Sequence, residues 1–174
     1  MKSLKLRCVN LDDTNTVNSD GAYPVRDADV ALAELAQACS NLLKLNLSRC
    51  GDFFLSRDAL RAIALKCTLL RDLDLSWSPA DDAGVTAVLD GCHELRMLSL
   101  QGCKQLTTDI SERLVRAPNL LWCDLSWVNN IDPDRSAEMV VENPRLCVVE
   151  YYGSSLSGRE SRWSPMNFDG GRAG

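Results

Sequence analysis

The stretch Cys92-His-Glu-Leu-Arg-Met-Leu-Ser-Leu-Gln-Gly-Cys103 places leucines at positions 95, 98 and 100 between two cysteines. It could be half of a metal site, one side of a disulfide or a single copy of a repeated pattern. The same order, a cysteine followed by leucines three, six and eight positions later, begins at Cys39 and at Cys67. Because three segments share one spacing, we interpret the stretch as a repeat unit.

The period of this repeat is close to 25 residues. Six copies can be aligned, and their central positions fall at residues 4, 45, 73, 98, 123 and 149. The words Leu73-Asp-Leu-Ser-Trp77 and Cys123-Asp-Leu-Ser-Trp127 recur fifty residues apart, which is two periods. Self-similarity at a fixed period of this length indicates a repeat architecture.

Each copy predicts one short strand followed by one helix. In Leu-x-x-Leu-x-Leu the last two leucines lie two positions apart, so they point to the same face of a strand. The pair Asp132-Pro133 predicts a helix start, and Thr107 or Thr108 can cap the preceding helix. The expected helices span residues 27–38, 57–66, 81–91, 108–116 and 133–142. A unit of this size cannot bury its apolar face alone, so the copies must stack on one another.

The predicted fold class is α/β: a right-handed solenoid with a horseshoe curve. It contains about six strand–helix repeats, with a parallel sheet on the concave side. Residues 1–155 form the repeat domain, with a polar loop inserted at about residues 11–26, where the first period is longer. Residues 156–174 are rich in Gly, Ser and Arg and are expected to form a disordered tail or a partial C-terminal cap.

The eight cysteines are expected to pack in the stack rather than to bind metal or to act in redox chemistry. No Cys-x-x-Cys pair occurs, so the usual ligand spacing of a structural zinc site is missing. Cys39, Cys67 and Cys92 share the position at the helix end, and Cys50 and Cys103 share the turn after the strand. Cysteine is small and apolar enough for tight buried turns. We therefore predict neither a metal site nor a cofactor.

Composition and charge narrow the classes of partner. The chain has 174 residues and a net charge of −5, which argues against a nucleic-acid partner held by bulk electrostatics. No run of about 18 apolar residues predicts a membrane span. The first residues lack the apolar segment of a signal peptide. We therefore expect a cytoplasmic or nuclear protein with reduced thiols.

The residues from Cys92 to Cys103 resemble, at every position, the strand half of the cysteine-containing subtype of the leucine-rich repeat family, Cys-x-x-Leu-x-x-Leu-x-Leu-x-x-Cys. That subtype continues into an Ile-Thr-Asp-like helix start. Residues 25–27, 55–58 and 106–109 are similar to this start. The resemblance covers residues 1 to about 155.

The subtype that this sequence resembles occurs in the F-box leucine-rich-repeat substrate receptors of SCF ubiquitin ligases and in relatives of the antagonist of mitotic exit network. In such receptors an F-box docks the ligase adaptor and the repeats capture the substrate. No Leu-Pro-containing F-box segment occurs in this sequence. The resemblance implies a non-catalytic interaction module for substrate recognition in SCF-type ubiquitin-dependent degradation, with ligase components among its partners. The alternative is a structural or scaffolding subunit of a larger assembly.

The residues beside the inward-facing leucines are expected to lie on the concave face and to bind a protein partner. Carboxylates gather in the later copies next to large aromatic residues, which are typical interface anchors. We therefore predict a partner segment that bears Lys or Arg. The predicted partner-binding residues are Asp72, Asp74, Trp77, Met97, Trp122, Asp124, Trp127, Glu150 and Tyr152. The alternative for Trp77 and Trp127, which share a register position, is that they cover the edge of the core.

Catalysis is not expected. Asp72 and Asp74 form a pair of carboxylates, but an open sheet lacks the cleft that would exclude water from acid–base chemistry. His93 is the only histidine and is expected in a solvated turn, so a histidine-based catalytic group has no second candidate.

Overall fold

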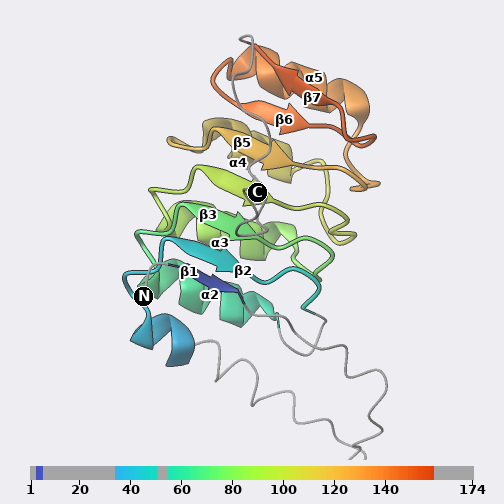
Figure 1. Cartoon of the computed structure of the whole chain (residues 1–174). Helices are drawn as coiled ribbons and strands as arrows, with labels where there is room; N and C mark the ends of the chain where they lie inside the picture. The colour runs from blue at the N-terminus through green and yellow to red at the C-terminus, as the bar shows by residue number, and fades with distance from the viewer. Residues whose placement is uncertain (1–2, 6–33, 51–54, 159–174) are drawn as a thin grey trace, which may run out of the picture.

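The computed structural model describes residues 3–5, 34–50 and 55–158, which form one sheet of seven strands in chain order. The first six strands pair in parallel, and the seventh is antiparallel to the sixth. Figure 1 shows the strands stacked as successive rungs. They are β1 (Ser3–Lys5), β2 (Lys44–Asn46), β3 (Asp72–Asp74), β4 (Met97–Ser99), β5 (Trp122–Asp124), β6 (Cys147–Val149) and β7 (Ser155–Ser157).

Helices alternate with the parallel strands. They are α2 (Arg57–Lys66), α3 (Asp82–Gly91), α4 (Ile110–Arg116) and α5 (Pro133–Glu142), and residues 34–38 are also helical. The predicted bounds 57–66 and 133–142 are confirmed, whereas α3 and α4 begin one and two residues later than predicted. Residues 27–33 of the first predicted helix and the predicted loop at 11–26 lie outside the described residues. The arrangement is α/β and compatible with a leucine-rich-repeat solenoid.

The strand register confirms the repeat, except in its last copy. Leu45 pairs with Leu73, Leu73 with Leu98, and Leu98 with Cys123. Cys123 then pairs with Val148, so the predicted central position at 149 is wrong by one residue. Because side chains alternate along a strand, a slip of one residue exchanges the two faces of the sheet.

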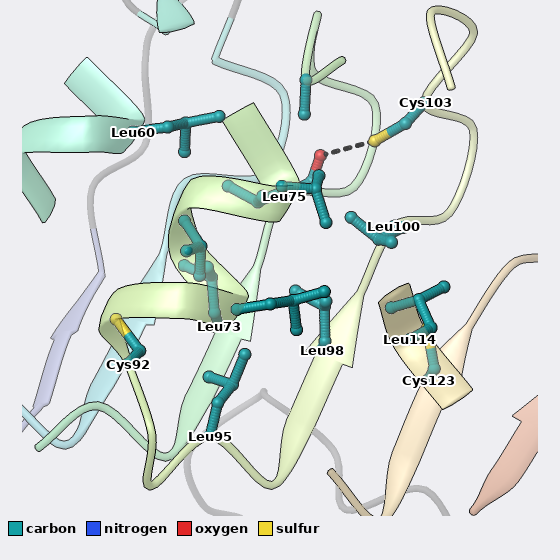
Figure 2. Close-up of a cluster of buried hydrophobic side chains, with 14 of the residues drawn as sticks. Leu60, Leu73, Leu75, Cys92, Leu95, Leu98, Leu100, Cys103, Leu114 and Cys123 are labelled. Carbon is teal, nitrogen blue, oxygen red and sulfur yellow. Dashed lines mark hydrogen bonds between the residues drawn. The ribbon is translucent and has the colours of Figure 1, made fainter. Parts of the chain in front are cut away.

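The apolar core fills the space between the helices and one face of the sheet. Leu73 and Leu98 from the strands and Leu75 and Leu100 from the following turns are fully buried there. Figure 2 shows these leucines beside Leu114, which enters from α4. Burial of one such side chain contributes about 2 kcal/mol, so the leucine columns supply much of the stability.

Most cysteines are packing residues, as expected. Among the described cysteines, Cys39, Cys67, Cys92, Cys103, Cys123 and Cys147 are free thiols. The Cys103 thiol donates to the carbonyl oxygen of Leu75 at 3.1 Å, which ties one turn to the previous copy (Figure 2). Burial, with a smaller contribution from Cys67, raises the pKa of the Cys92 thiol to about 12. Cys50 is the exception to the expectation of reduced thiols, because it is disulfide-bonded.

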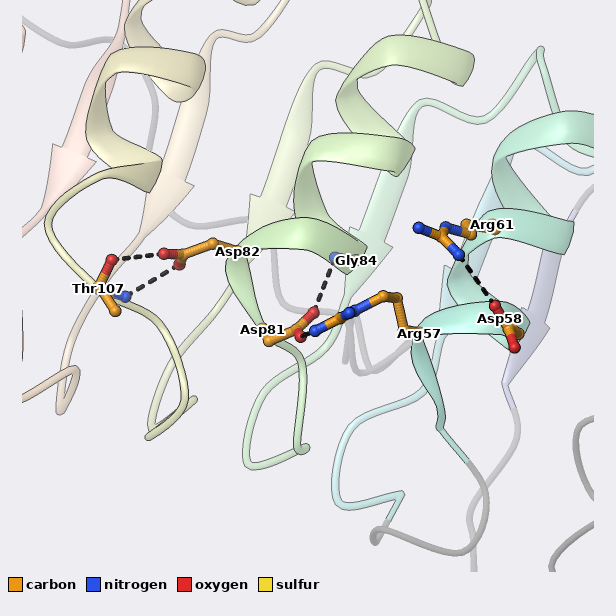
Figure 3. Close-up of polar contacts among 7 residues, drawn as sticks. All are labelled: Arg57, Asp58, Arg61, Asp81, Asp82, Gly84 and Thr107. Atoms are coloured by element: carbon orange, nitrogen blue, oxygen red, sulfur yellow. Dashed lines mark hydrogen bonds and ion pairs between the residues drawn. The ribbon is translucent and has the colours of Figure 1, made fainter.

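Polar contacts link the start of each helix to its neighbour (Figure 3). Asp81 caps α3, because its Oδ1 accepts a hydrogen bond from the Gly84 N–H at 2.8 Å. The other oxygen of Asp81 accepts from Nε of Arg57, the first residue of α2, at 3.1 Å. One copy further, Asp82 accepts from the backbone N–H of Thr107 at 2.9 Å. Polar contacts therefore join the start of α2 to the start of α3, and the start of α3 to the segment before α4.

The caps predicted for the last two helices have different outcomes. Asp132 caps α5 and accepts from the Asp134 N–H at 2.9 Å, which confirms that prediction. The predicted cap of α4 by Thr107 or Thr108 is wrong, because Asp109 occupies the N-cap position and makes no side-chain capping bond. The Thr107 hydroxyl instead donates to Asp82.

The last strand adds an antiparallel edge to the parallel stack. Ser157 pairs with Cys147 and Ser155 with Val149. Gly153, at φ 87°, forms the turn between β6 and β7. The predicted tail at 156–174 thus begins inside β7, and residues 159–174 lie outside the described residues. Across the described helices, none is both long and apolar enough to cross a bilayer.

Candidate partner-binding face

Among the described elements, no helix packs against one face of the sheet, and this face holds most of the predicted site residues. Residues of the leucine column, such as Leu73 and Leu98, point into the core with the helices. Their strand neighbours must point the other way, because side chains alternate along a strand. We call that side the open face and define it by three columns across β2–β6: residues 44, 72, 97, 122 and 147; residues 46, 74, 99, 124 and 149; and residues 48, 76, 101, 126 and 151.

An apolar cluster occupies the later half of the open face. It contains Met97, Trp122, Cys147 and Val149, which form a second group separate from the main core. Each of these side chains is no more than 9% exposed. Among the described side chains, the Trp122 Nε1 is buried without a hydrogen-bond partner. A buried N–H group without an acceptor costs about 1–3 kcal/mol, so this atom is suited to meet an acceptor on the open face.

A polar network occupies the earlier half of the open face. Asn46 Nδ2 donates to Oδ2 of Asp74 at 2.9 Å, which joins β2 to β3. The other oxygen of Asp74 accepts from the backbone N–H and the hydroxyl of Ser76, at 2.9 and 2.6 Å. In the later half of the face, Asp124 on β5 likewise accepts from the backbone N–H and the hydroxyl of Ser126. These contacts fix the turn after each strand, as Asx turns do, so both carboxylates have a structural role.

The column that begins at Lys44 contains one ion pair. Asp72 lies opposite Lys44 in the register, and its carboxylate approaches the Lys44 Nζ at 2.5 Å. Asp72 is buried while the lysine side chain is half exposed. The predicted gathering of carboxylates in the later copies therefore begins at β3, where Asp72 is paired with a lysine of β2.

An aromatic edge follows the ends of the strands. The aromatic edge comprises Trp77, Trp127, Tyr151 and Tyr152. Trp77 and Trp127 are 42% and 52% exposed, and Tyr152 is 80% exposed. The rings of Trp127 and Tyr151 lie 5.7 Å apart, and those of Tyr151 and Tyr152 lie 5.0 Å apart in an edge-to-face arrangement. Exposed aromatic groups fixed against one another are typical interface anchors.

The backbone explains why the two tryptophans point outward. Arg49, Trp77 and Trp127 have φ values of 59°, 58° and 61°, and Gly102 has the equivalent value of 67°. A left-handed conformation costs a non-glycine residue about 1 kcal/mol or more, so the turn imposes it at each copy. The indole of Trp77 covers Gly102, where an added Cβ would lie 2.5 Å from an indole carbon. Trp77 is therefore partly a cover for the next turn and partly exposed.

The structure brings most of the predicted site residues to this face. Asp72, Asp74, Met97, Trp122 and Asp124 lie in its columns.

The last copy of the pattern requires two corrections. Val149, not Glu150, shares the column of Asp74 and Asp124. By the same one-residue slip, Tyr152 belongs with the exposed tryptophans and not with Ser126.

Sequence reasoning missed three residues of the face. Cys147 and Val149 complete the apolar cluster, and the ring of Tyr151 packs at a tilt against that of Trp127. A strict period of 25 from Cys123 would have placed Val148 in the core and its two neighbours on the open face. That signal was present in the spacing of the previous three copies.

A hollow of about 450 Å³ lies between the starts of α2 and α3. Arg57 and Arg61 line it, together with Asp58 and Asp81. Arg57 pairs with Asp81, and Arg61 with Asp58, so the charges largely neutralise one another. The hollow therefore does not select an anion or a cation.

Metal ligands do not gather in the part of the chain that the structure describes. No group of three His, Cys, Asp or Glu side chains there could hold a metal ion. His93 is exposed in a turn, where its carbonyl oxygen accepts from Asn119 at 2.8 Å, and the predicted solvated position is confirmed.

The sequence is similar to several curated proteins. It is 28% identical over 179 residues to putative F-box/LRR-repeat protein 23 of Arabidopsis thaliana, covering 94% of this chain and 38% of that protein. It is 26% identical over 159 residues to DNA repair protein RAD7 of Saccharomyces cerevisiae, covering 91% of this chain and 26% of that protein. It is 30% identical over 136 residues to F-box protein SKIP19 of Arabidopsis thaliana, covering 68% of this chain and 45% of that protein. No family model matches the chain.

These similarities confirm the resemblance to F-box leucine-rich-repeat proteins, at modest identity. The chain spans less than half the length of each of these relatives.

Proposed function

We propose that this relative of F-box leucine-rich-repeat proteins is a non-catalytic module that binds a protein partner on its open face. The observation that carries the proposal is the aromatic edge beside the apolar cluster, on the one face of the sheet that the helices leave uncovered. Flat, rigid side chains next to a desolvated patch supply interface energy at low cost in side-chain entropy.

The chemistry of the face favours a partner segment with both apolar and basic groups. Met97 and Trp122 offer apolar contact, while Asp74 and Asp124 place carboxylates in the adjacent column. Carboxylate oxygens that already accept hydrogen bonds can also accept from an incoming Arg or Lys. Glu150 follows β6 and is half-buried, but it lies outside this column, which ends at Val149.

The proposal extends to the biological context. Two relatives carry F-box in their names, which supports substrate recognition in SCF-type ubiquitin-dependent degradation, with ligase components as further partners. A right-handed, horseshoe-shaped stack and a cytoplasmic or nuclear location belong to the same proposal. The net charge of −5 supports partners other than nucleic acid and membrane.

A structural subunit of a larger assembly is the second candidate. Its supporting observation lies on the helix side, where Leu65 and Val141 are 75% and 80% exposed. A permanent assembly would bury such residues, whereas an exchangeable adaptor would use the open face and leave them free.

Quantitative affinity purification tests the proposal and separates the two candidates. The full chain is compared with an edge variant, Trp127→Ala/Tyr152→Ala, and with a matched control, Leu65→Ala/Val141→Ala. All four positions are exposed, so both variants should fold. Loss of exchangeable, substoichiometric partners only from the edge variant supports the adaptor. Loss of stoichiometric partners only from the control supports the subunit, and unchanged recovery by the edge variant contradicts the proposal.

A further inference from the structure

The two exposed tryptophans of the aromatic edge recur at a regular interval. Trp77 and Trp127 occupy the same position after β3 and β5, with φ values of 58° and 61°. β4 lies between these strands and contributes Gly102 at the equivalent position, which has no side chain to fill the interval. Strands in a sheet lie about 4.8 Å apart, so equivalent positions two strands apart are separated by about 9.6 Å.

Contacts within the stack hold both indoles at this interval. Each ring leans toward the following copy: that of Trp77 covers Gly102, and that of Trp127 packs against a tyrosine that follows β6. The Trp77 Nε1 donates to Gln101 Oε1 at 3.2 Å, and Gln101 Nε2 donates to Ser126 Oγ at 3.1 Å. Gln101 thus spans the gap between the two tryptophan copies. The spacing of the rings is therefore fixed before a partner binds.

The interval matches one turn of a polyproline II helix. That helix has about three residues per turn and rises about 3.1 Å per residue, so every third residue recurs after about 9.3 Å on the same side. In an extended strand the residue three positions further points to the opposite face. Two turns of an α-helix span about 10.8 Å, which is a poorer match. The polyproline II conformation therefore fits the two indoles best.

Hydrogen bonding favours the same conformation. A polyproline II segment makes no internal hydrogen bonds, so its carbonyl oxygens are free to accept from a partner. Trp127 supplies a donor, because no acceptor among the described residues meets its Nε1–H. Aromatic side chains are the usual docking surface for proline-rich segments.

Charges at the two ends of the aromatic edge give the bound segment a direction. Arg49 occupies the equivalent turn after β2, one strand before Trp77, and is exposed. Glu150 follows β6 at the other end and immediately precedes Tyr151. Neither charged side chain forms an ion pair within the described ranges. A basic residue of a partner is therefore repelled at the Arg49 end and attracted at the Glu150 end.

We propose that the aromatic edge binds a proline-rich segment of a protein partner in the polyproline II conformation. Two residues of the segment, three positions apart, pack on Trp77 and Trp127. A carbonyl oxygen of the segment accepts the Trp127 Nε1–H, and a Lys or Arg pairs with Glu150. This role of the edge rests on the proposed function and specifies the chemistry of the partner.

Fluorescence anisotropy with defined peptides tests this role on the full chain. The probe is a fluorescein-labelled oligoproline of about ten residues, or about three turns, that ends in arginine. One control peptide ends in glutamate instead. A second replaces the prolines with alternating glycine and serine and keeps the arginine, so it carries the charge on a flexible chain. The protein variants are Trp127→Ala and Trp127→Phe, with Leu65→Ala/Val141→Ala on the helix side as the matched control.

We expect Trp127→Ala to weaken binding of the oligoproline probe about tenfold or more. Trp127→Phe should weaken it less, because it keeps a ring and loses only the donor. The matched control should bind as the unchanged chain does, and the glutamate peptide should bind more weakly than the probe. The proposal is overturned if the glycine–serine or glutamate peptide binds as tightly as the probe, or if Trp127→Ala binds like the unchanged chain.

A second measurement needs no variant that binds the probe. In the unchanged chain, the indole N–H resonance of Trp127 is identified by its absence from the spectrum of Trp127→Phe. This resonance should shift when the oligoproline probe is added, because the N–H gains an acceptor. A resonance that stays in place at saturating probe would overturn the proposal.

The peptide assay and the affinity purification fail separately. If the edge variant loses its partners but the unchanged chain does not bind oligoproline, the proline-rich segment is wrong and the proposed function stands. If oligoproline binds through Trp127 but the edge variant recovers its partners unchanged, the peptide site is supported and the proposed function is contradicted.

Discussion

Asn46 on β2 and Asp74 on β3 are joined by a hydrogen bond of 2.9 Å from Nδ2 to Oδ2. Both side chains are nearly buried on the open face, at 5% and 8% exposure. The same carboxylate holds the backbone N–H and the hydroxyl of Ser76. One aspartate therefore ties two rungs together and fixes the turn that places Trp77. The open face and the stability of the stack therefore depend on the same residues.

Removal of the Asp74 carboxylate should destabilise the stack. Asp74→Ala leaves the donors of Asn46 and Ser76 without their acceptor, and we expect a loss of about 2–4 kcal/mol in the free energy of unfolding. Asp74→Asn keeps an acceptor oxygen and should lose less than half of that. Urea denaturation of the two variants measures the difference. Equal midpoints for Asp74→Ala and the unchanged chain would contradict the role assigned to this carboxylate.

Asp81 should make the free energy of unfolding depend on pH in the acidic range. Its burial alone would raise the pKa, but hydrogen bonds from Arg57 and Gly84 and the Arg57 charge outweigh burial and lower the pKa below 3.8. A group with a lowered folded-state pKa stabilises above its unfolded pKa, and this stabilisation disappears as pH falls through the folded pKa.

The matched variant for this prediction is Asp81→Asn, because asparagine still caps a helix. We expect the unchanged chain to be more stable than Asp81→Asn at pH 7, by less than about 1 kcal/mol. The difference should narrow as pH falls below 3.8, the ordinary pKa of the group. Thermal melts from pH 7 to pH 3 measure it. A difference that grows on acidification would contradict the assigned shift.

Gly102 should resist substitution for two separable reasons. Its φ of 67° disfavours any residue with a Cβ, and the Trp77 indole occupies the space that the Cβ would take. We expect Gly102→Ala to cost about 1–3 kcal/mol. In a double-mutant cycle with Trp77→Ala the steric part should vanish while the conformational part remains. Strict additivity of the two substitutions would show that the indole does not cover this turn.

The free thiols should differ strongly in reactivity. Cys39 is partly exposed, whereas Cys92 is buried with a pKa of about 12 and Cys123 is fully buried. Because the thiolate is the reactive form, iodoacetamide at pH 8 should modify Cys39 first and leave Cys92 and Cys123 unmodified until unfolding. Timed alkylation with peptide mapping measures the order. Early modification of Cys92 would contradict its position in the core.

Much of the fold could be predicted from the leucine spacing, because side chains two positions apart on a strand point to the same face. The pairing of Leu45, Leu73, Leu98 and Cys123 followed from one period, and the helix bounds followed from what lies between. Five of the predicted site residues lie in the columns of the open face for the same reason.

The remainder depended on information that a periodic pattern does not contain. Val148 and Val149 are both apolar, so hydrophobicity alone could not decide which one faces the core. The left-handed turns at Trp77 and Trp127 follow local Asp–Ser contacts, which the spacing of the leucines does not encode. β7 contains serines on both sides of Leu156, a weak strand signal that antiparallel pairing with β6 overrides.

The central claim is that a register of 25 residues sends alternate side chains of each strand to the core and to the open face. Val148 and Val149 test it most directly, because they are chemically identical neighbours assigned to opposite faces. Thermal unfolding is measured for Val148→Asp and Val149→Asp. We predict that Val148→Asp loses more than about 4 kcal/mol and its cooperative transition, because it buries a charge in the core. Val149→Asp should keep a cooperative transition, and an equal or larger loss for Val149→Asp would contradict the register and the face built on it.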